Sequence, residues 1–418
     1  METDLRSLNK RLGAYLSVDN DVIELPETGV VWINDRNPQL FVTRFLKALD
    51  QGRTVALLPF EMEPIREEGV ARLIRTYEES GCYGMGPEIL ILTGGSGGTL
   101  RFVRHCWETL ISATIAFGER FTPSMAATVI TLPLYHVSGL MAFIRALVFN
   151  APFQWMDYRT LIEEPEHLPE GGSLSLVPTQ LSRWLESDPS GAPLKRLGAV
   201  LLGGAKLSEG LALRCHRLSL PIVPCYGMTE TAAMVCALES HNFNHGVIGC
   251  GSALPHASIW IDAGQIALSS ESLCYGYWPD TAHFNRNHFL TGDKGFINEA
   301  GSLVIEGRMD RLINTGGEKV DPVRIERVFE PLFGEDQVHV LGIADPVWGE
   351  RVVAVYKGQA VEEETLVAMM KTAGLQRHEC PKDWIHLDHF PRSTLGKLLY
   401  ARLKITVEAF LKDRLSAD

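Results

Sequence analysis

The chain lacks an apolar run long enough to cross a lipid bilayer, and its first residues, METDLRSLNKRLG, lack the apolar core of a secretory signal. Its eight cysteines are scattered, and no two of them form a C-x-x-C pair. This pattern argues against a disulfide framework and favours reduced thiols. We therefore expect a cytoplasmic protein with no membrane span.

The chain also lacks an excess of positive charge. It has 39 Lys and Arg against 51 Asp and Glu, a formal net charge of −12, which argues against nucleic acid as the main partner. An anionic ligand would have to be attracted by local Lys or Arg side chains, a divalent cation or backbone N–H groups. With no internal repeat, 45% apolar and 22% charged residues, the 418 residues suit a large domain plus a small one. Whether copies assemble into a homo-oligomer is left open.

The order of the predicted elements favours an α/β fold. Short apolar strands alternate with helices in the first part of the chain, which predicts parallel sheets covered by helices. Strands are expected at residues 54–59, 88–92, 128–134, 174–177, 199–202 and 222–225, and helices at 39–50, 63–80, 107–117, 178–186 and 208–218. We expect the second helix to be interrupted near Gly69. From Gly246 to Gly307 short strands and turns replace the helices, which predicts a β-rich subdomain.

Two short apolar runs at 294–297 and 302–307 are joined by a turn-rich connection and predict a β-hairpin. Asp293 is expected just before this hairpin and Arg308 just after it. A strand at 311–314 then leads to a Gly-Gly pair, and a helix follows. That helix is expected to begin at Asp321, with a proline in its first turn, and to stop at Pro331.

A glycine-rich loop, TGGSGGT at residues 93–99, directly follows a predicted strand. Such a loop lets backbone N–H groups approach phosphates, although on its own the pattern is more typical of a flexible loop. It is not a Walker A loop, because no Lys-Ser/Thr pair follows. The candidate phosphate-binding residues are Thr93, Gly94, Gly95, Ser96 and Thr99, with Arg101 adding a positive charge after them.

The segment CYGMTET at residues 225–231 also follows a predicted buried strand. Tyr226 offers a ring on which adenine can stack, Thr229 offers a hydroxyl to an α-phosphate, and Glu230 offers a hard oxygen ligand to Mg²⁺. The alternative interpretation is a strand-to-helix turn capped by a threonine. The buried strand before the segment favours the nucleotide-binding interpretation.

Histidines give weaker signals. His136 lies in LPLYHVSG, and a histidine among apolar residues is more often a core group than a catalyst. His241 and His245 are four residues apart but lack the glutamate of an HExxH motif and a nearby cysteine, so we expect them at the surface.

The late motifs resemble the signature of the adenylate-forming (AMP-binding) superfamily of acyl-CoA synthetases. They are TGD at 291–293, GRMDRLINTGGEKV at 307–320 and PVRIE at 322–326. The resemblance implies that Asp293 and Arg308 hold the ribose hydroxyls of ATP and that Asp310 is a hinge. It implies a large ATP- and acyl-binding domain at 1–309 and a small mobile α+β C-terminal domain at 310–418.

The motifs DPVWGERVVA at 345–354 and PRSTLGK at 391–397 extend the resemblance. In this family the last lysine, here Lys397, reaches into the ATP site and stabilises charge during adenylation, whereas a lone lysine is otherwise a surface charge. Gly316 and Gly317 would line a channel for the CoA pantetheine, where a side chain would obstruct the thiol.

The chain departs from the family in two places. The phosphate loop of the family usually ends in Pro-Lys-Gly, whereas Leu100-Arg101-Phe102 stands here, so that Arg101 keeps the positive charge. The part of the chain before Thr93 is short for the superfamily, and we expect some N-terminal elements to be missing or reduced.

SLVPTQLSRWL at 175–185 and AVLLGGA at 199–205 resemble one branch of the superfamily, the 2-succinylbenzoate–CoA ligases of menaquinone and phylloquinone biosynthesis. Their substrate has two carboxylates, of which only one is activated, so the spare one needs a polar or cationic partner. The candidates are Ser175, Thr179 and Arg183, although Arg183 equally fits a solvated helix face. The resemblance also implies that His136 lies by the acyl pocket and that Gly203 and Gly204 allow adenine and acyl group to pass close to the backbone.

The resemblance thus implies an AMP-forming ligase that uses ATP, Mg²⁺ and CoA to convert 2-succinylbenzoate into its CoA thioester. Two alternatives stay open. One is an adenylating enzyme for a different acid, loading a carrier protein, against which the SLVPTQL segment argues. The other is a non-catalytic nucleotide-binding relic, motivated by the unusual phosphate loop, against which the intact Glu230, Asp293, Arg308 and Lys397 argue.

Overall fold

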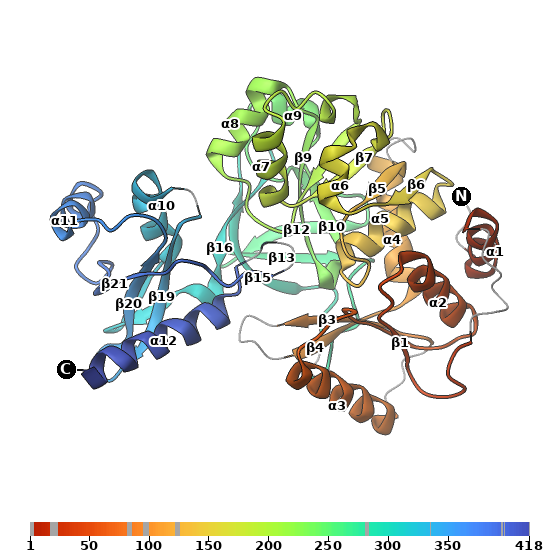
Figure 1. The fold of residues 1–418 in the computed structure, drawn as a ribbon, viewed down its shortest axis with the longest axis horizontal. Helices are drawn as coiled ribbons and strands as arrows, with labels where there is room; N and C mark the ends of the chain where they lie inside the picture. The colour runs from red at the N-terminus through yellow and green to blue at the C-terminus, as the bar shows by residue number, and fades with distance from the viewer. Residues whose placement is uncertain are drawn as a thin grey trace.

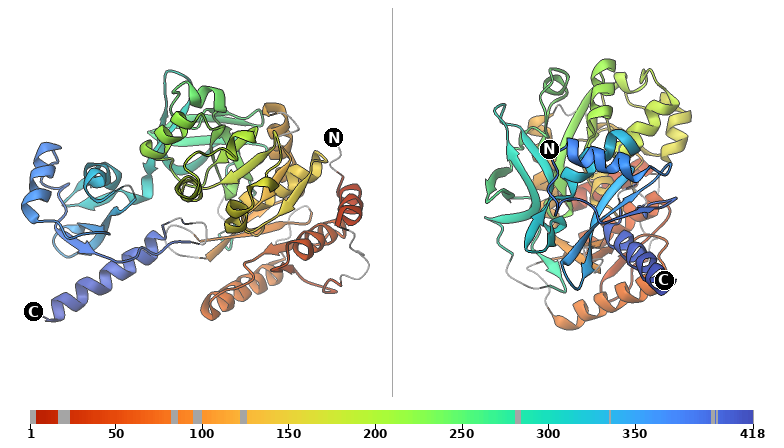
Figure 2. Two further views of the ribbon diagram at one scale, coloured as in Figure 1. Left: turned by 45° about the horizontal axis from the view of Figure 1, so that its top comes forward. Right: turned by 90° about the vertical axis from the view of Figure 1, so that its left-hand side faces the viewer.

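The computed structural model describes residues 4–16, 24–81, 86–94, 100–121, 126–280, 284–334, 336–393, 396 and 398–417. Figure 1 shows a large part formed by the earlier residues and a smaller part, formed by the C-terminal residues, at one end of it. The views in Figure 2 show the same division, with α12 (Tyr400–Ala417) running away from the junction of the two parts.

The first sheet of the large part has the order β1-β2-β3-β4-β14, with β1, β2 and β3 parallel and the last two pairings antiparallel. Its strands are β1 (Val31–Ile33), β2 (Val55–Leu57), β3 (Ile89–Gly94), β4 (Leu100–His105) and β14 (Tyr277–Trp278). The helices beside it are α1 (Leu5–Leu16), α2 (Pro38–Asp50) and α3 (Pro64–Ser80). Because β14 comes from much later in the chain, this sheet brings residues near 277 next to the strand that follows the glycine loop.

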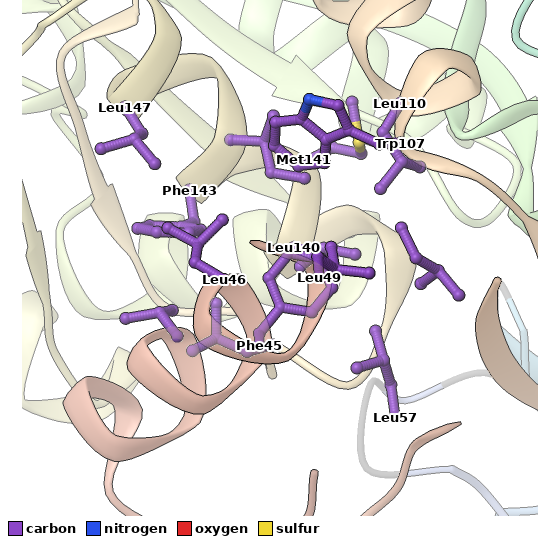
Figure 3. Close-up of a cluster of buried hydrophobic side chains, with 14 of the residues drawn as sticks. Phe45, Leu46, Leu49, Leu57, Trp107, Leu110, Leu140, Met141, Phe143 and Leu147 are labelled. Carbon is purple, nitrogen blue, oxygen red and sulfur yellow. The ribbon is translucent and has the colours of Figure 1, made fainter. Parts of the chain in front are cut away.

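A large apolar cluster joins this sheet to the next one. Figure 3 shows Phe45, Leu46 and Leu49 from α2 against Leu140, Met141 and Phe143 from α5 (Val137–Val148), with Trp107 and Leu110 from α4 (Trp107–Arg120) beside them. All eight are buried. Burial of apolar surface on this scale holds the two sheets in a fixed relation.

The second sheet has the order β11-β10-β9-β8-β7-β5-β6. Its strands are β5 (Thr128–Ile130), β6 (Phe153–Trp155), β7 (Ser173–Leu176), β8 (Ala199–Leu202), β9 (Ile222–Met228), β10 (Ala233–Ala237) and β11 (Ser252–Ala253). The five neighbouring strands β6, β5, β7, β8 and β9 pair in parallel, whereas β10 pairs antiparallel with both β9 and β11. Besides α4 and α5, the helices of this layer are α6 (Tyr158–Glu163), α7 (Pro178–Ser187), α8 (Glu209–Leu218) and α9 (Ser240–Asn244).

The third sheet is antiparallel, with the order β12-β13-β15-β16. Its strands are β12 (Ala257–Asp262), β13 (Gln265–Ser270), β15 (Phe289–Ile297) and β16 (Leu303–Arg308). The hairpin is therefore longer than expected. Asp293 lies inside β15 rather than before it, and Arg308 is the last residue of β16, since the two residues pair across the ladder.

The smaller part contains β17 (Ile313–Thr315), β18 (Glu318–Val320), β19 (Val338–Asp345), β20 (Gly349–Tyr356) and β21 (Asp383–His386), with α10 (Pro322–Phe333), α11 (Glu363–Thr372) and α12. Its sheet has the order β18-β17-β20-β19, and β21 pairs with β20. Two apolar clusters are made entirely of residues from 313 to 411. A separate core suits a separate domain, and the boundary at residues 309 and 310 stays a prediction.

The predicted α/β fold class, with its helix-covered sheets, β-rich subdomain and small α+β part, is confirmed. Three local expectations are wrong. The helix α3 runs through Gly69 without interruption, because Val70, Ile74 and Tyr77 anchor it in the core. The helix α10 passes Pro331 and ends at Phe333, where the φ of 96° at the following Gly334 breaks it. The predicted strand at 311–314 begins only at Ile313, after the 3₁₀ turn η6 (Met309–Arg311).

Candidate active site

Tyr226 lies at the edge of the β-rich subdomain, where β9 ends. Its side chain is 8% exposed and its hydroxyl donates a 2.7 Å hydrogen bond to Oδ2 of Asp293. Burial raises the pKa of Tyr226, so the phenol stays protonated and remains a donor. The next residue, Gly227, has no room for a side chain, because a Cβ there would lie 1.8 Å from the carbonyl oxygen of Ala233.

The same aspartate connects to the predicted ribose-binding arginine and to the predicted hinge. Arg308 Nη1 lies 3.1 Å from Asp293 Oδ1, and Arg308 Nη2 lies 3.0 Å from Asp310 Oδ2. The hydrogen bonds to Asp310 and the charge of Asp293 raise the pKa of Arg308. Tyr226, Asp293, Arg308 and Asp310 thus form one chain of polar contacts. A ligand with adjacent hydroxyls could bind to its carboxylate and guanidinium groups.

Glu230 lies in the 3₁₀ turn η5 (Thr229–Thr231), which follows β9. Its Oε1 accepts a 2.8 Å hydrogen bond from the hydroxyl of Tyr277 and lies 3.6 Å from Nη2 of Arg101. The guanidinium of Arg101 in turn lies over the Tyr277 ring, 3.8 Å from its centroid. The structure therefore brings Arg101, at the end of the glycine loop, together with the predicted metal ligand.

Each of the three backbone carbonyl oxygens of this turn accepts a hydrogen bond. His105 Nε2 lies 2.7 Å from the oxygen of Thr229, the N–H of Cys274 donates to Glu230 O at 2.7 Å, and Ser272 Oγ donates to Thr231 O at 2.9 Å. Burial lowers the pKa of His105 to about 4, so its ring is neutral and carries its proton on Nε2, which faces a carbonyl oxygen. Sequence reasoning missed His105, because its partner is 124 positions away.

A buried arginine was also missed. Arg145, on the apolar helix α5, is 7% exposed. Its Nη2 lies 3.4 Å from Ser175 Oγ, and its guanidinium lies over the ring of Phe117, 4.9 Å from the centroid. Burial lowers the pKa of Arg145 to about 10, and among the described residues no acidic side chain pairs with it. The only sequence signal for it is a single charge in the apolar run LMAFIRALV.

The other predicted acyl-side residues lie in different surroundings. His136 is the N-cap residue of α5, and burial, together with the charge of Arg66, lowers its pKa to about 4. Arg183 is exposed on α7. Thr179, at the start of α7, lies against Gly396 of the C-terminal part. A Cβ added to Gly396 would be only 2.7 Å from the Thr179 Oγ1. Gly204 has a φ of 79°, a conformation that favours glycine, and follows Gly203 at the end of β8.

Gly95, Ser96, Thr99 and Lys397 lie outside the described residues. Thr93 and Gly94 end β3, next to the glycine loop. The neighbour of Lys397, Gly396, is described, and it closely approaches Thr179 in the large part of the chain.

Gly316 and Gly317 form the turn between β17 and β18, both with positive φ. Trp348 covers this turn, and its carbonyl accepts a 2.8 Å hydrogen bond from the Gly316 N–H. A Cβ on Gly316 would lie 3.0 Å from the Trp348 ring, so the glycine is required by its neighbour as well as by its backbone angle.

Within the described ranges, no three His, Cys, Asp or Glu side chains gather in a way that could hold a metal ion. Mg²⁺ in proteins usually keeps several water or phosphate ligands and binds only one or two carboxylates, so Glu230 fits such an ion. The ring centroids of His241 and His245 lie 4.1 Å apart with the rings tilted by 47°, and both residues are exposed, as expected. No helix in the described part of the chain combines the length and the apolarity that a membrane crossing requires.

These features agree with what the chain is similar to. A model of the AMP-binding enzyme family matches residues 46–278, more than half of the chain, and the chain therefore belongs to that family.

Individual relatives indicate which members of this family the chain resembles. The chain is 28% identical to a 2-succinylbenzoate–CoA ligase of Listeria monocytogenes over 320 residues, 75% of this chain and 68% of the relative. It is 27% identical to one of Staphylococcus epidermidis over 431 residues, 96% and 89% of the two chains. The o-succinylbenzoate CoA synthetase of Bacillus subtilis, solved with its acyl-adenylate intermediate, superposes with a TM-score of 0.76 at 20% identity, over 96% of this chain and 92% of that one. At this identity the superposition shows a shared fold.

Proposed function

We propose that the chain is an AMP-forming acid–CoA ligase that adenylates 2-succinylbenzoate and transfers the acyl group to CoA. The products are 2-succinylbenzoyl-CoA, AMP and pyrophosphate, and the reaction belongs to menaquinone or phylloquinone biosynthesis. Membership of the AMP-binding family and the named relatives support the reaction class. The particular acid rests on one structural observation, the buried Arg145.

A guanidinium that is 7% exposed and has no described acidic partner is costly to bury unless a ligand completes its interactions. A carboxylate matches it in charge and in the geometry of its two oxygens. Ser175, at 3.4 Å from Arg145, supplies a further hydroxyl at the same place. We therefore assign the unreacted carboxylate of the substrate to Arg145 and Ser175, in preference to the exposed Arg183.

In the first half of the reaction, an oxygen of the other carboxylate attacks the α-phosphorus of ATP. A new P–O bond forms, the bond to the pyrophosphate oxygen breaks, and pyrophosphate leaves with the electron pair. Tyr226, Asp293 and Arg308 bind the nucleoside, and the hydroxyl of Thr229 and the loop at 93–99 bind phosphate. Mg²⁺ bound at Glu230 would neutralise phosphate charge. The protein's task is positioning and charge stabilisation, to which Lys397 contributes.

In the second half, the CoA thiol attacks the acyl carbon. A C–S bond forms, the C–O bond to AMP breaks, and the thiol proton is released. We propose that residues 310–418 rotate about Asp310 between the two halves, which removes Lys397 and brings Gly316 and Gly317 to the thiol channel. The contact between Gly396 and Thr179 suits the first of these arrangements.

We also propose the cytoplasm as the place of action. The seven cysteines among the described residues are all free thiols, as is typical of a reducing compartment.

The test is pyrophosphate release with ATP and Mg²⁺, using 2-succinylbenzoate, benzoate, a fatty acid or no acid, followed by a repeat with CoA and mass analysis of the thioester. We expect release with 2-succinylbenzoate and a CoA thioester in the repeat. Release with a different acid would reject the substrate but keep the reaction class. Transfer to a carrier protein instead of CoA would favour the carrier-loading alternative, and ATP binding without any release would favour the relic.

A further inference from the structure

Tyr277 is the residue of this site that neither the motifs nor the proposed mechanism uses. It lies on β14, the strand that returns to the first sheet and pairs with β4, where Tyr277 faces Val103. The segment before it is fixed from two sides. Cys274 N–H donates to Glu230 O at 2.7 Å, and Tyr275 N–H donates to Arg104 O at 2.8 Å. These two backbone hydrogen bonds, one of them to Glu230 itself, hold the segment that carries Tyr277 in place.

The side chain of Tyr277 acts on one oxygen of Glu230. Its hydroxyl donates to Oε1 at 2.8 Å, and Arg101 Nη2 lies 3.6 Å from the same oxygen. Among the described residues, no group donates a hydrogen bond to Oε2. A phenol carries its proton at neutral pH and a carboxylate oxygen accepts, so Tyr277 is the donor in this hydrogen bond. The carboxylate is thus fixed through one oxygen and presents the other.

We propose that Tyr277 is a positioning residue that fixes the Glu230 carboxylate so that its free oxygen can bind the divalent cation of the nucleotide. This inference rests on the proposed function for the identity of the nucleotide and the cation. Carboxylate ligands of metals are commonly oriented by such a hydrogen bond, and loss of it typically weakens metal binding or activity about 10- to 100-fold.

The ring of Tyr277 has a second possible role, and a substitution separates the two. Arg101 stacks on the ring, 3.8 Å from its centroid, so a purely supporting Tyr277 would act through the ring and not through the hydroxyl. Tyr277→Phe keeps the ring and removes only the hydroxyl. Tyr277→Leu removes both.

The chain offers a matched control two residues away. Tyr275 lies on the same segment, its ring lies under Arg286 at 4.7 Å, and its hydroxyl accepts a 3.5 Å hydrogen bond from Cys106. Among the described residues, the Tyr275 hydroxyl makes no hydrogen bond to Glu230. Tyr275→Phe therefore makes the same chemical change two residues away in the same segment, without removing a hydrogen bond to the carboxylate.

Two measurements on the full-length variants test the proposal. The first is the Mg²⁺ concentration that gives half-maximal pyrophosphate release at saturating ATP and acid, which we expect to rise about 10-fold or more in Tyr277→Phe and to stay unchanged in Tyr275→Phe. The second is binding, with Mn²⁺ detected by its paramagnetic resonance on the enzyme–ATP complex and metal-free AMP measured by calorimetry. We expect weaker Mn²⁺ binding and unchanged AMP binding in Tyr277→Phe.

A wild-type Mg²⁺ dependence in Tyr277→Phe would overturn the proposal, and so would a change seen only in Tyr277→Leu, because the ring would then carry the effect. An equal loss of metal-free AMP binding would also overturn it, since that indicates general disruption. The proposed function can fail separately. If the wild type releases no pyrophosphate with any acid, the Mn²⁺ measurement still decides whether Tyr277 orients Glu230.

Discussion

The nucleotide side and the acyl side of the candidate site differ in how their charges are satisfied without a ligand. On the nucleotide side, Asp293, Arg308 and Glu230 all have partners within the protein. On the proposed acyl side, Arg145 is more deeply buried, and among the described residues it has the Ser175 hydroxyl and the Phe117 ring beside it but no acidic partner. The proposed nucleotide side is thus organised before binding, whereas the proposed acyl side would need a substrate carboxylate for its full set of interactions.

This difference separates two properties of the enzyme. A pre-organised nucleotide side serves any acid, because the nucleotide chemistry is the same for each one. A buried charge without an acidic partner selects among acids, because a substrate that cannot pair with it leaves it unsatisfied. Reaction class and substrate choice should therefore respond to different substitutions.

The largest expected effect is on the nucleotide side and in one half-reaction only. Lys397→Ala should slow acyl-adenylate formation by about 100- to 1,000-fold, the usual cost of losing one stabilising group for transition-state charge. Thioester formation from supplied acyl-adenylate should remain near the wild-type rate, because the proposed rotation removes Lys397 from the site before that step. The measurement is single-turnover kinetics of each half separately.

Lys404→Ala is the control for this variant. Lys404 lies on α12 of the same domain and pairs with Glu350, 3.6 Å away. The Lys404→Ala substitution should leave both half-reactions unchanged. Equal loss of both halves in Lys397→Ala would contradict the assignment of this lysine and the rotation about Asp310.

The next effect is on the acyl side and depends on the acid. Arg145→Met should lower kcat/KM for 2-succinylbenzoate about 100-fold, mainly through KM, because truncating one partner of a buried charge pair costs about 2–5 kcal/mol. A benzoate analogue without the second carboxylate should lose far less. Steady-state kinetics with both acids measures the difference.

Arg183→Met tests the competing assignment that the sequence suggested. Since Arg183 is exposed on α7, this variant should keep the wild-type preference for the dicarboxylic acid. The reverse outcome, with preference lost in Arg183→Met and kept in Arg145→Met, would move the carboxylate site to α7.

The two sides also differ in how well the sequence predicts them. Asp293, Arg308 and Glu230 lie in compact motifs, so a short stretch of chain carries enough information to propose a role for each. Arg145 meets Ser175 across 30 positions, and Tyr277 meets Glu230 across 47. Only strand order brings such pairs together, and strand order depends on packing of the whole chain.

The same limit applies to the fold, since the local sequence predicts the elements whereas packing of the whole chain decides their order in the sheets. Alternating apolar strands and helices predict the class of sheet, but not that β5 lies between β6 and β7 or that β14 joins the first sheet. Gly69 illustrates the local limit. A glycine costs a helix only about 1 kcal/mol, which the burial of neighbouring residues outweighs in α3.

A smaller effect is expected from the support beneath the nucleotide side. His105→Phe removes the 2.7 Å side-chain donor to Thr229 O and leaves this carbonyl only the 3.3 Å hydrogen bond from the Ala232 N–H, which should reduce pyrophosphate release about tenfold. His105→Gln retains an N–H donor and should restore part of the rate. KM for the acid should not change in either variant, and a change there as large as the change in kcat would argue for general disruption of the fold.

The smallest expected effect is on the pH dependence of stability, since each side has one histidine whose pKa is lowered. Burial lowers the pKa of both His105 and His136 from 6.5 to about 4. Between these values the unfolded chain binds protons that the folded chain does not, so stability falls as the pH is lowered from 6.5 towards 4 and is complete above 6.5. Each histidine contributes at most about 1.4 kcal/mol per pH unit in this window. Thermal unfolding at pH 7 and pH 5 should show a smaller decrease in Tm for His105→Gln and His136→Gln than for the wild type. The exposed His241→Gln should behave as the wild type does, and an identical decrease in Tm in all four proteins would show that the fold keeps neither His105 nor His136 neutral.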